Sequence, residues 1–146
     1  MRIALGADHA GFELKETIKR HLIDKGITID DQGTHSPDSV DYPDYARLVC
    51  EQLAQKKADW GILVCGTGIG MAMAANKMPG IRAANARSEI DAQLSREHNN
   101  ANVLTLGGRV LDEKTAVRIV DRWLNTAFLG GRHERRVAKI TELERP

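Results

Sequence analysis

The chain of 146 residues has the length of one ordinary domain and can bury a core without disulfides or a structural metal. Its 21 basic and 20 acidic residues nearly cancel, so the composition argues against a protein that binds nucleic acid or a charged membrane surface. Cys50 and Cys65 are its only cysteines, and they do not form a C-x-x-C pair. No apolar run approaches the roughly 20 residues that a membrane span needs. The first residues have the pattern of a strand rather than that of a signal segment. We therefore expect one cytoplasmic domain covering residues 1–146.

Short apolar runs alternate with longer helical patterns along the chain. Strands are expected at 2–5, 27–30, 60–64, 81–84 and 102–106. Six helices are expected. The first lies between Gly11 and Gly26, the second follows Asp41 as its N-cap, the third covers 72–77, and the fourth runs from a Ser88 cap to residue 97. The fifth carries Ala116, Ile119, Val120, Trp123 and Leu124 on one face, and the sixth covers 132–144. This order predicts an α/β fold in which five strands form a mostly parallel sheet, with helices on both faces and a C-terminal helix.

Polar residues follow three of the expected strands, at the edge where parallel sheets bind ligands. Asp8 and His9 follow the first strand, residues 65–70 follow the third, and Arg109 follows the last. Asp8 and His9 have no evident structural task there beyond capping the next helix, so a functional and a capping role both stay open. We expect these groups to lie near one another in the fold.

The segment Cys65-Gly66-Thr67-Gly68-Ile69-Gly70-Met71 lies between the third strand and the next helix. Its alternate glycines allow a sharp turn whose N–H groups point at an anion. The spacing matches neither a P-loop nor a G-x-G-x-x-G dinucleotide motif, which argues against a nucleotide site. A lone cysteine at a strand end is often only a packing residue, but the adjoining N–H groups favour a thiolate, so Cys65 is a candidate for catalysis. Cys50 falls beside the core face of a helix and is expected to be structural.

The five histidines do not form a metal-binding pattern. None is paired at i, i+4 or with a suitable carboxylate or cysteine, so no metal site is expected. His98 precedes Asn99 and Asn100 after a helical segment. The histidine could merely end that helix, and the asparagines could simply turn the chain.

A cluster of basic residues follows the glycines at 130–131. On a helix, Arg132 and Arg136 lie one turn apart on the same face, where both guanidinium groups can hold one phosphate while Val137 and Ile140 face the core. Arginines at a helix start oppose the helix dipole, which suggests that an anionic ligand offsets them. A solvated basic helix end is the alternative.

Several stretches together resemble one known family. The strings GADHAGFELK, DYPDYA, GILVCGTGIGMAMAANK, IRAA, SREHNNANVLTLGGRV and GGRHERRV are similar to those of type B ribose-5-phosphate isomerases, from the first strand into the last helix. The resemblance implies a three-layer α/β/α Rossmann-like fold and an aldose-ketose isomerase of the pentose phosphate pathway that uses no metal or organic cofactor. It also implies a sugar phosphate substrate and a homodimer, alone or paired into a homotetramer, with its active sites at the subunit interface.

The same resemblance assigns roles to residues of this chain. Cys65 is implied to be the base that moves a proton between C2 and C1 of the open-chain sugar through an enediolate, assisted by Thr67. His98 is implied to be the acid that opens the sugar ring, and Arg132 and Arg136 are implied to bind the phosphate. Some of these residues are implied to come from the partner subunit. The other implied substrate contacts are Asp8, His9, Tyr42, Gly66, Gly68, Ile69, Gly70, Asn99 and Arg109.

Alternatives to this assignment stay open. Galactose-6-phosphate isomerases of the same family divide the site between two different subunits, whereas this chain carries Cys65, His98 and Arg132 together and is expected to be self-sufficient. A six-carbon substrate, such as allose 6-phosphate or galactose 6-phosphate, is the nearest alternative, and Met71 is expected to change the room beside the loop. A module that binds phosphate or nucleotide without catalysis is the alternative from another class.

Overall fold

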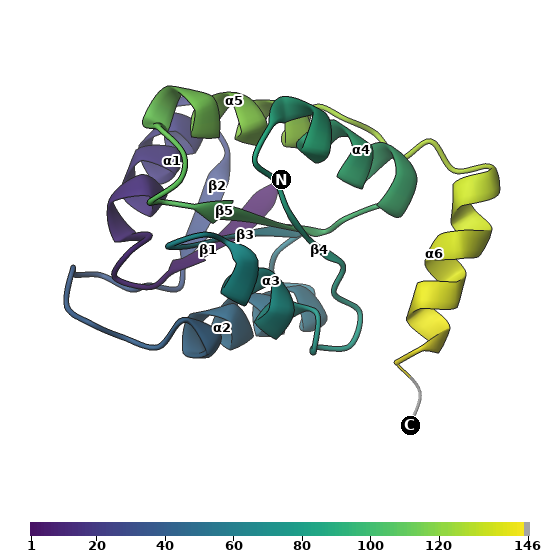
Figure 1. The fold of residues 1–146 in the computed structure, drawn as a ribbon, viewed down its shortest axis with the longest axis horizontal. Helices are drawn as coiled ribbons and strands as arrows, with labels where there is room; N and C mark the ends of the chain where they lie inside the picture. Colours follow the sequence, from purple (N-terminus) through teal and green to yellow (C-terminus); the bar gives the residue numbers. More distant parts are fainter. Residues whose placement is uncertain (145–146) are drawn as a thin grey trace.

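The computed structural model of the protein describes residues 1–144. Within them, strands and helices alternate along the chain (Figure 1), and none of the helices is both long and apolar enough to cross a membrane. The elements are β1 Arg2–Ala7, α1 Phe12–Asp24, β2 Thr28–Asp31, α2 Tyr42–Ala54, β3 Trp60–Cys65, α3 Ile69–Ala75, β4 Ala83–Asn85, α4 Glu89–Asn99, β5 Val103–Gly107, α5 Glu113–Leu124 and α6 Arg132–Glu142.

The strands form one sheet in the order β2-β1-β3-β5-β4, and every neighbouring pair is parallel. Parallel neighbours need crossover connections, so helices cover both faces of the sheet. Helices α1, α4 and α5 lie on one face, and α2 and α3 lie on the other (Figure 1). The expected three-layer α/β/α fold is confirmed.

Two apolar clusters fill the space between the layers, because successive side chains of a strand point to opposite faces. Ile3 and Leu5 of β1 pack toward α1 and α5, whereas Ala4 packs toward α2 and α3. Cys50 of α2 is fully buried in the second cluster, and burial together with the nearby Glu51 raises the pKa of its thiol to about 12. The structural role expected for Cys50 is confirmed.

The fourth strand begins later than its sequence predicts. β4 covers only Ala83–Asn85, and the two residues before it belong to the preceding turn. There the Ile81 N–H donates to a carbonyl within the turn, and the Arg82 N–H donates to the Asn102 side chain at 2.8 Å. These bonds occupy donors that a longer ladder would need.

The helix ends agree with the sequence in one case and differ in two. Ser88 is the N-cap of α4, and its hydroxyl accepts the Asp91 N–H at 3.2 Å, as expected. Asp41 occupies the N-cap position of α2, but its side chain makes no capping hydrogen bond. Helix α4 continues past its expected end until Asn100 stops it in the left-handed conformation, with φ of 48°. His98 therefore lies in the last helical turn rather than after it.

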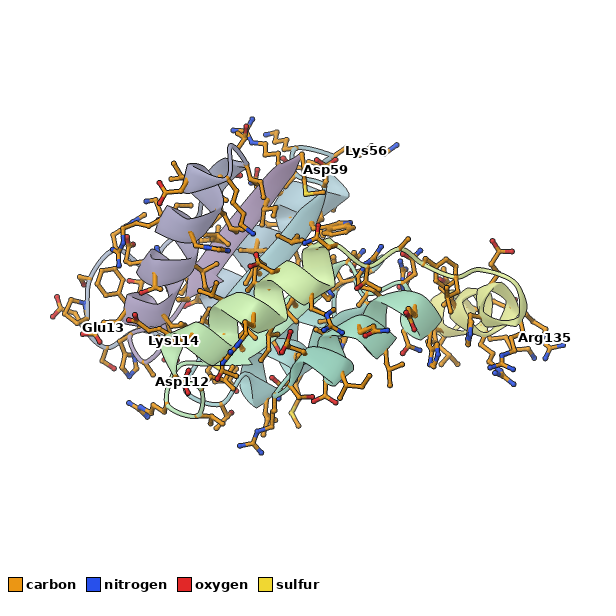
Figure 2. The ribbon with its side chains drawn as sticks, turned by 90° about the horizontal axis from the view of Figure 1, so that it is seen from above. Glu13, Lys56, Asp59, Asp112, Lys114 and Arg135 are labelled. Carbon is orange, nitrogen blue, oxygen red and sulfur yellow. The ribbon has the colours of Figure 1, made fainter. Side chains whose placement is uncertain are left out.

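The last helix lies away from the sheet. Helix α6 packs against α4 and projects from the body of the molecule (Figures 1 and 2), with Arg135 at the far end of Figure 2. Its buried residue is His133, while Val137 is half-buried and Ile140 is 42 % exposed. The expectation that Ile140 faces the core is wrong, because α6 does not pack on the sheet.

Candidate active site

The crevice beyond the carboxyl ends of β1 and β3 is the topological switch point of the sheet. The chain leaves β1 toward one side for β2 and returns on the other side for β3, and such points bind ligands in α/β proteins. Ala7 of β1 lies opposite Val64 of β3, so Asp8 and Cys65 come next to each other in register. A pocket of about 430 Å³ opens there, lined by Asp8, Tyr42, Cys65, Gly66, Thr67, Ile69, Gly70 and Met73.

The glycine loop after β3 is held tightly against β5. Gly68 has φ of +83°, and a Cβ there would collide with the Asn85 side chain and lie 2.9 Å from the backbone carbon of Leu106. From the other side, the buried Thr105 hydroxyl donates to the Gly68 carbonyl at 2.8 Å and lies 3.2 Å from Asn85 Oδ1. These contacts fix the backbone N–H groups of the loop in one orientation.

Cys65 places its sulfur at the inner end of this pocket. The residue is 4 % exposed, and its Sγ accepts a hydrogen bond from the Gly68 N–H at 3.2 Å. Thr67 is exposed on the same loop, where its hydroxyl accepts the Ile69 N–H at 3.2 Å. The sulfur and the threonine hydroxyl thus both lie along the pocket.

Asp8 and His9 follow β1 and have defined hydrogen-bond partners. Asp8 Oδ1 accepts the Gly11 N–H at 3.0 Å and so closes the turn before α1. Gly11 itself is the N-cap of α1, and no side chain makes a capping hydrogen bond there, so the structure does not give Asp8 the capping role. His9 Nδ1 accepts the Val40 N–H at 3.2 Å. A ring nitrogen that accepts carries no proton, so the proton of the neutral His9 ring is on Nε2. Nε2 is therefore the nitrogen of this ring that can donate a hydrogen bond.

Tyr42 and Arg109 flank the glycine loop. The Tyr42 ring lies beside Gly70, where an added Cβ would be 2.7 Å from Tyr42 Cε1. Arg109 follows β5; its backbone N–H donates to the Gly66 carbonyl at 3.0 Å, and its side chain passes over Gly66. The structure therefore brings these two residues to the same edge as Cys65.

Met71 does not lie in the pocket. It is fully buried in the core cluster on the α2 and α3 side, whereas Met73 is 66 % exposed and lines the pocket. On the short helix α3, Ile69, Gly70 and Met73 share the pocket side, while Met71 and Ala75 face the core. The expectation that Met71 changes the room beside the loop is therefore wrong.

Four expected site residues lie at the opposite edge of the sheet: His98, Asn99, Arg132 and Arg136. Helix α4 ends where β5 begins, whereas the glycine loop lies beside the end of β5. The 5 residues of β5 separate these edges by about 17 Å, at roughly 3.3 Å per residue. In Figure 2, Arg135 of α6 lies at the far end of the molecule from Glu13 and Asp112, which follow the carboxyl ends of β1 and β5. A single chain does not bring these four residues to Cys65.

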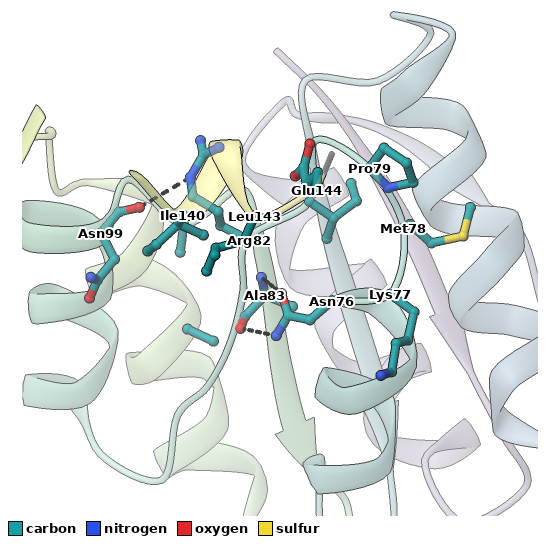
Figure 3. Close-up of a pocket in the computed structure, with 13 residues that line it drawn as sticks. Asn76, Lys77, Met78, Pro79, Arg82, Ala83, Asn99, Ile140, Leu143 and Glu144 are labelled. Atoms are coloured by element: carbon teal, nitrogen blue, oxygen red, sulfur yellow. Dashed lines mark hydrogen bonds between the residues drawn. The ribbon is translucent and has the colours of Figure 1, made fainter. Parts of the chain in front are cut away.

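Two arginines hold the turn between α4 and β5. The Arg82 guanidinium donates to the Asn99 carbonyl at 3.2 Å (Figure 3) and to the Asn100 carbonyl at 2.9 and 3.0 Å. Arg96 is 6 % exposed, donates to Asn100 Oδ1 at 3.0 Å and lies over the Trp60 ring, 4.3 Å from its centroid. A groove of about 600 Å³ opens beside this turn, between Arg82 and the last part of α6. The backbone on which Asn99 sits is thus fixed by side chains.

His98 stacks on His133 of α6, with ring centroids 4.4 Å apart and an angle of 14° between the rings. Burial lowers the pKa of His133, and the neighbouring His98, Arg132 and Arg136 lower it further, while Glu97 acts in the opposite direction. Nowhere in residues 1–144 do three His, Cys, Asp or Glu side chains gather closely enough to hold a metal ion.

Sequence reasoning did not identify four residues that shape these two edges: Arg82, Asn85, Thr105 and His133. The first three lie in or next to short strands and act through long-range contacts that no local spacing predicts. His133 could have been identified from the sequence, because it lies between the two arginines of the expected phosphate clamp.

Known proteins resemble this chain over nearly its whole length. Residues 3–140 match the Ribose/Galactose Isomerase family. Ribose-5-phosphate isomerase B of Escherichia coli K12 is 48 % identical over 143 residues, which cover 98 % of this chain and 96 % of that protein. The crystal structure of a ribose 5-phosphate isomerase from Thermotoga maritima has a TM-score of 0.95 and 54 % identity over 97 % of both chains. The structure of Mycoplasma genitalium ribose-5-phosphate isomerase B with bound ribulose-5-phosphate has a TM-score of 0.95 and 44 % identity over 98 % of this chain and 95 % of that one. The chain therefore belongs to the ribose/galactose isomerase family.

Proposed function

We propose that this chain, as one domain over residues 1–146, interconverts ribose 5-phosphate and ribulose 5-phosphate in the pentose phosphate pathway. The observation that carries the proposal is the position of Cys65, whose sulfur accepts the Gly68 N–H at the switch point of the sheet. The Escherichia coli and Thermotoga maritima relatives are named for this activity, and the Mycoplasma genitalium structure holds ribulose-5-phosphate. These names favour a five-carbon substrate over a six-carbon one.

Cys65 acts as the base in this proposal. A proton next to a carbonyl group is weakly acidic, so its removal needs a well-placed base and donors for the oxygens of the enediolate. The Cys65 thiolate takes the proton from C2 of the open-chain aldose and returns it to C1, while a proton passes from O2 to O1. The N–H groups of residues 66–70 and the Thr67 hydroxyl hold the two oxygens during this transfer.

In this proposal, ring opening and phosphate binding use the residues at the amino ends of the strands, opposite the edge where Cys65 lies. Ribose 5-phosphate is mostly a closed ring, and His98 opens it by protonating the ring oxygen, a task that suits an imidazole near neutral pH. Arg132 and Arg136 bind the phosphate through charge-assisted hydrogen bonds, which hold the reacting carbons beside Cys65. The sugar is further contacted by Asp8, His9, Tyr42, Asn99 and Arg109.

We further propose a homodimer in which Cys65 of one chain meets His98, Arg132 and Arg136 of the other. The separation of the two edges within one chain supports this arrangement. Exposed apolar side chains on α3 and α4 offer a surface for the second copy to cover: Ile69, Met73, Ile90 and Leu94. The two free cysteines are consistent with a cytoplasmic location.

The direct test is a parallel assay of the purified chain with ribose 5-phosphate and allose 6-phosphate. We expect a higher kcat/KM for ribose 5-phosphate. Faster turnover of the six-carbon sugar would move the substrate to the alternative class, and binding of either sugar without turnover would favour the non-catalytic module. A chelator is expected to leave the rate unchanged, because acid-base groups alone carry the proposed steps; activity lost to chelation and restored by metal would contradict this mechanism.

A further inference from the structure

We propose that His133 is a positioning residue that holds the His98 imidazole in the orientation needed to open the sugar ring. The inference rests on the proposed function, in which His98 is the ring-opening acid. It adds a role for a buried side chain that contacts neither the glycine loop nor the pocket around Cys65.

The stack is the contact that fixes the His98 ring. The two rings are nearly parallel, 14° apart, at a centroid separation of 4.4 Å. The stack covers a face of the His98 ring, whereas the two nitrogens lie at the ring edge, so this contact leaves the nitrogens available to a substrate. His133 itself is only 7 % exposed, and its position in the first turn of α6 gives it a fixed backbone.

The backbone on both sides of the stack is also held in place. Arg82 and Arg96 bond the turn that follows His98. The segment that leads into α6 is attached to α4 by the Leu129 N–H, which donates to the Glu97 carbonyl at 3.2 Å. With both backbones fixed, the remaining freedom is rotation of the His98 side chain, and the flat face of His133 limits that rotation.

The charge state of His133 suits this role. Burial, together with the neighbouring His98, Arg132 and Arg136, lowers the pKa of His133 against the opposite effect of Glu97, which favours the uncharged ring. A neutral ring can lie flat against His98 whether or not His98 carries a proton, whereas two charged imidazoles at this separation would repel each other.

Loss of the His133 ring is expected to slow ring opening and to leave the proton transfer at Cys65 unchanged. Ring opening of ribose 5-phosphate breaks the C1–O4 bond, adds a proton to O4 and removes one from the C1 hydroxyl, and this step needs a well-oriented His98. Ribulose 5-phosphate has its 5-hydroxyl esterified, so it has no furanose ring to open. Removal of its C1 proton by Cys65 is therefore independent of His98.

The test compares these two reactions in His133→Ala and His133→Phe, with His21→Ala as a matched control. His21 is a partly buried histidine on the distant α1, where it pairs with Asp121. We expect His133→Ala to lower kcat for ribose 5-phosphate by about tenfold or more, and to change deuterium incorporation at C1 of ribulose 5-phosphate in heavy water by less than about twofold. His133→Phe, which keeps a flat ring, should restore most of the lost turnover. When His98→Ala is already present, His133→Ala should not lower kcat for ribose 5-phosphate any further, because His133 acts through His98.

Each other outcome overturns the inference. Equal loss of both reactions would mean that His133 only supports the fold, and unchanged turnover of ribose 5-phosphate would mean that the stack has no role. A His133→Phe variant as slow as His133→Ala would mean that a ring nitrogen of His133 acts directly. If the unmodified chain converts neither sugar, the proposed function itself fails, which is a distinct result.

Discussion

The two edges of the sheet hold their polar groups in different ways. We call the edge at the carboxyl ends of the strands, where Cys65 lies, the carboxyl edge, and the edge at the amino ends, where His98 lies, the amino edge. At the carboxyl edge, the donors belong to the backbone, and Cys65 is 4 % exposed in a loop that Gly68 and Thr105 fix against β5. At the amino edge, the groups are long side chains on α4 and α6, and Arg132 and Arg136 are exposed. A rigid backbone suits the stabilisation of a developing charge, whereas long exposed arginines suit the phosphate binding proposed for them.

The carboxyl edge also has a buried ion pair behind it. Lys15 is fully buried and donates to Asp31 at 2.7 Å, and Asp31 also accepts the Gly33 N–H at 2.9 Å. The Gly33 carbonyl in turn accepts the Ala7 N–H, directly before Asp8. We therefore expect changes at the carboxyl edge to affect chemistry and stability, and changes at the amino edge to affect mainly substrate binding and ring opening.

The largest expected effect is that of Cys65→Ala. Loss of the proposed base should lower kcat for ribose 5-phosphate by about 10³-fold, within the range for general-base catalysis, while the fold is retained. Steady-state assays and circular dichroism measure the two properties. Cys50→Ala is the matched control, since Cys50 is a buried thiol outside the pocket, and its kcat should stay near that of the unmodified chain. A fully active Cys65→Ala variant would remove the proposed mechanism.

A mixing experiment tests whether the two edges meet across a dimer. Cys65→Ala and His98→Ala chains are unfolded together and refolded as a mixture. Each mixed dimer then has one site with both residues intact, so random pairing should restore about a quarter of the activity of the unmodified dimer. If each site belonged to a single chain, the mixture would be no more active than the separate variants.

The rigidity of the loop after β3 is tested by substituting two glycines that have similar positive φ angles. Gly68 and Gly26 have φ of +83° and +80°, but an added Cβ meets close neighbours at Gly68 and nothing within 4 Å at Gly26. Gly26→Ala should cost only the backbone strain, about 1–2 kcal/mol. Gly68→Ala should destabilise the protein by more and also lower kcat, because the loop must move. Equal unfolding free energies in denaturant titrations would contradict the tight packing of the loop.

Chain order predicted the carboxyl edge well because parallel strands end side by side. Asp8 and Arg109 each follow a strand, Cys65 is the last residue of one, and the order of the strands is enough to bring the three residues to the same edge. The position of α6 could not be predicted in this way. Val137 and Ile140 have the spacing of a core-facing stripe, but the stripe does not say which surface it covers, and Ile140 remains 42 % exposed.

The loop and the amino edge show a second limit of sequence reasoning. The side chains of Thr105 and Arg82 donate hydrogen bonds to carbonyl oxygens 37 and 18 positions away, those of Gly68 and Asn100. Such bonds depend on how strands are paired, and sequence spacing does not contain that information. Met71 shows the same limit on a smaller scale, since the side of α3 that faces the pocket depends on how the short helix is rotated.

The smallest expected effect on activity comes from substituting Arg136, an exposed residue of α6. Arg136→Ala should raise KM for ribose 5-phosphate by about tenfold and change kcat little, because one charge-assisted contact to a non-reacting phosphate is lost, worth about 1.4 kcal/mol. Arg135→Ala is the matched control: Arg135 precedes Arg136 on α6, is also exposed and points to a different side of the helix. Inorganic phosphate should inhibit the unmodified chain and Arg135→Ala alike, and Arg136→Ala more weakly, because the anion occupies the same position. An equal rise of KM in both variants would show that general positive charge attracts the substrate, and an unchanged KM in Arg136→Ala would remove the phosphate clamp from this edge.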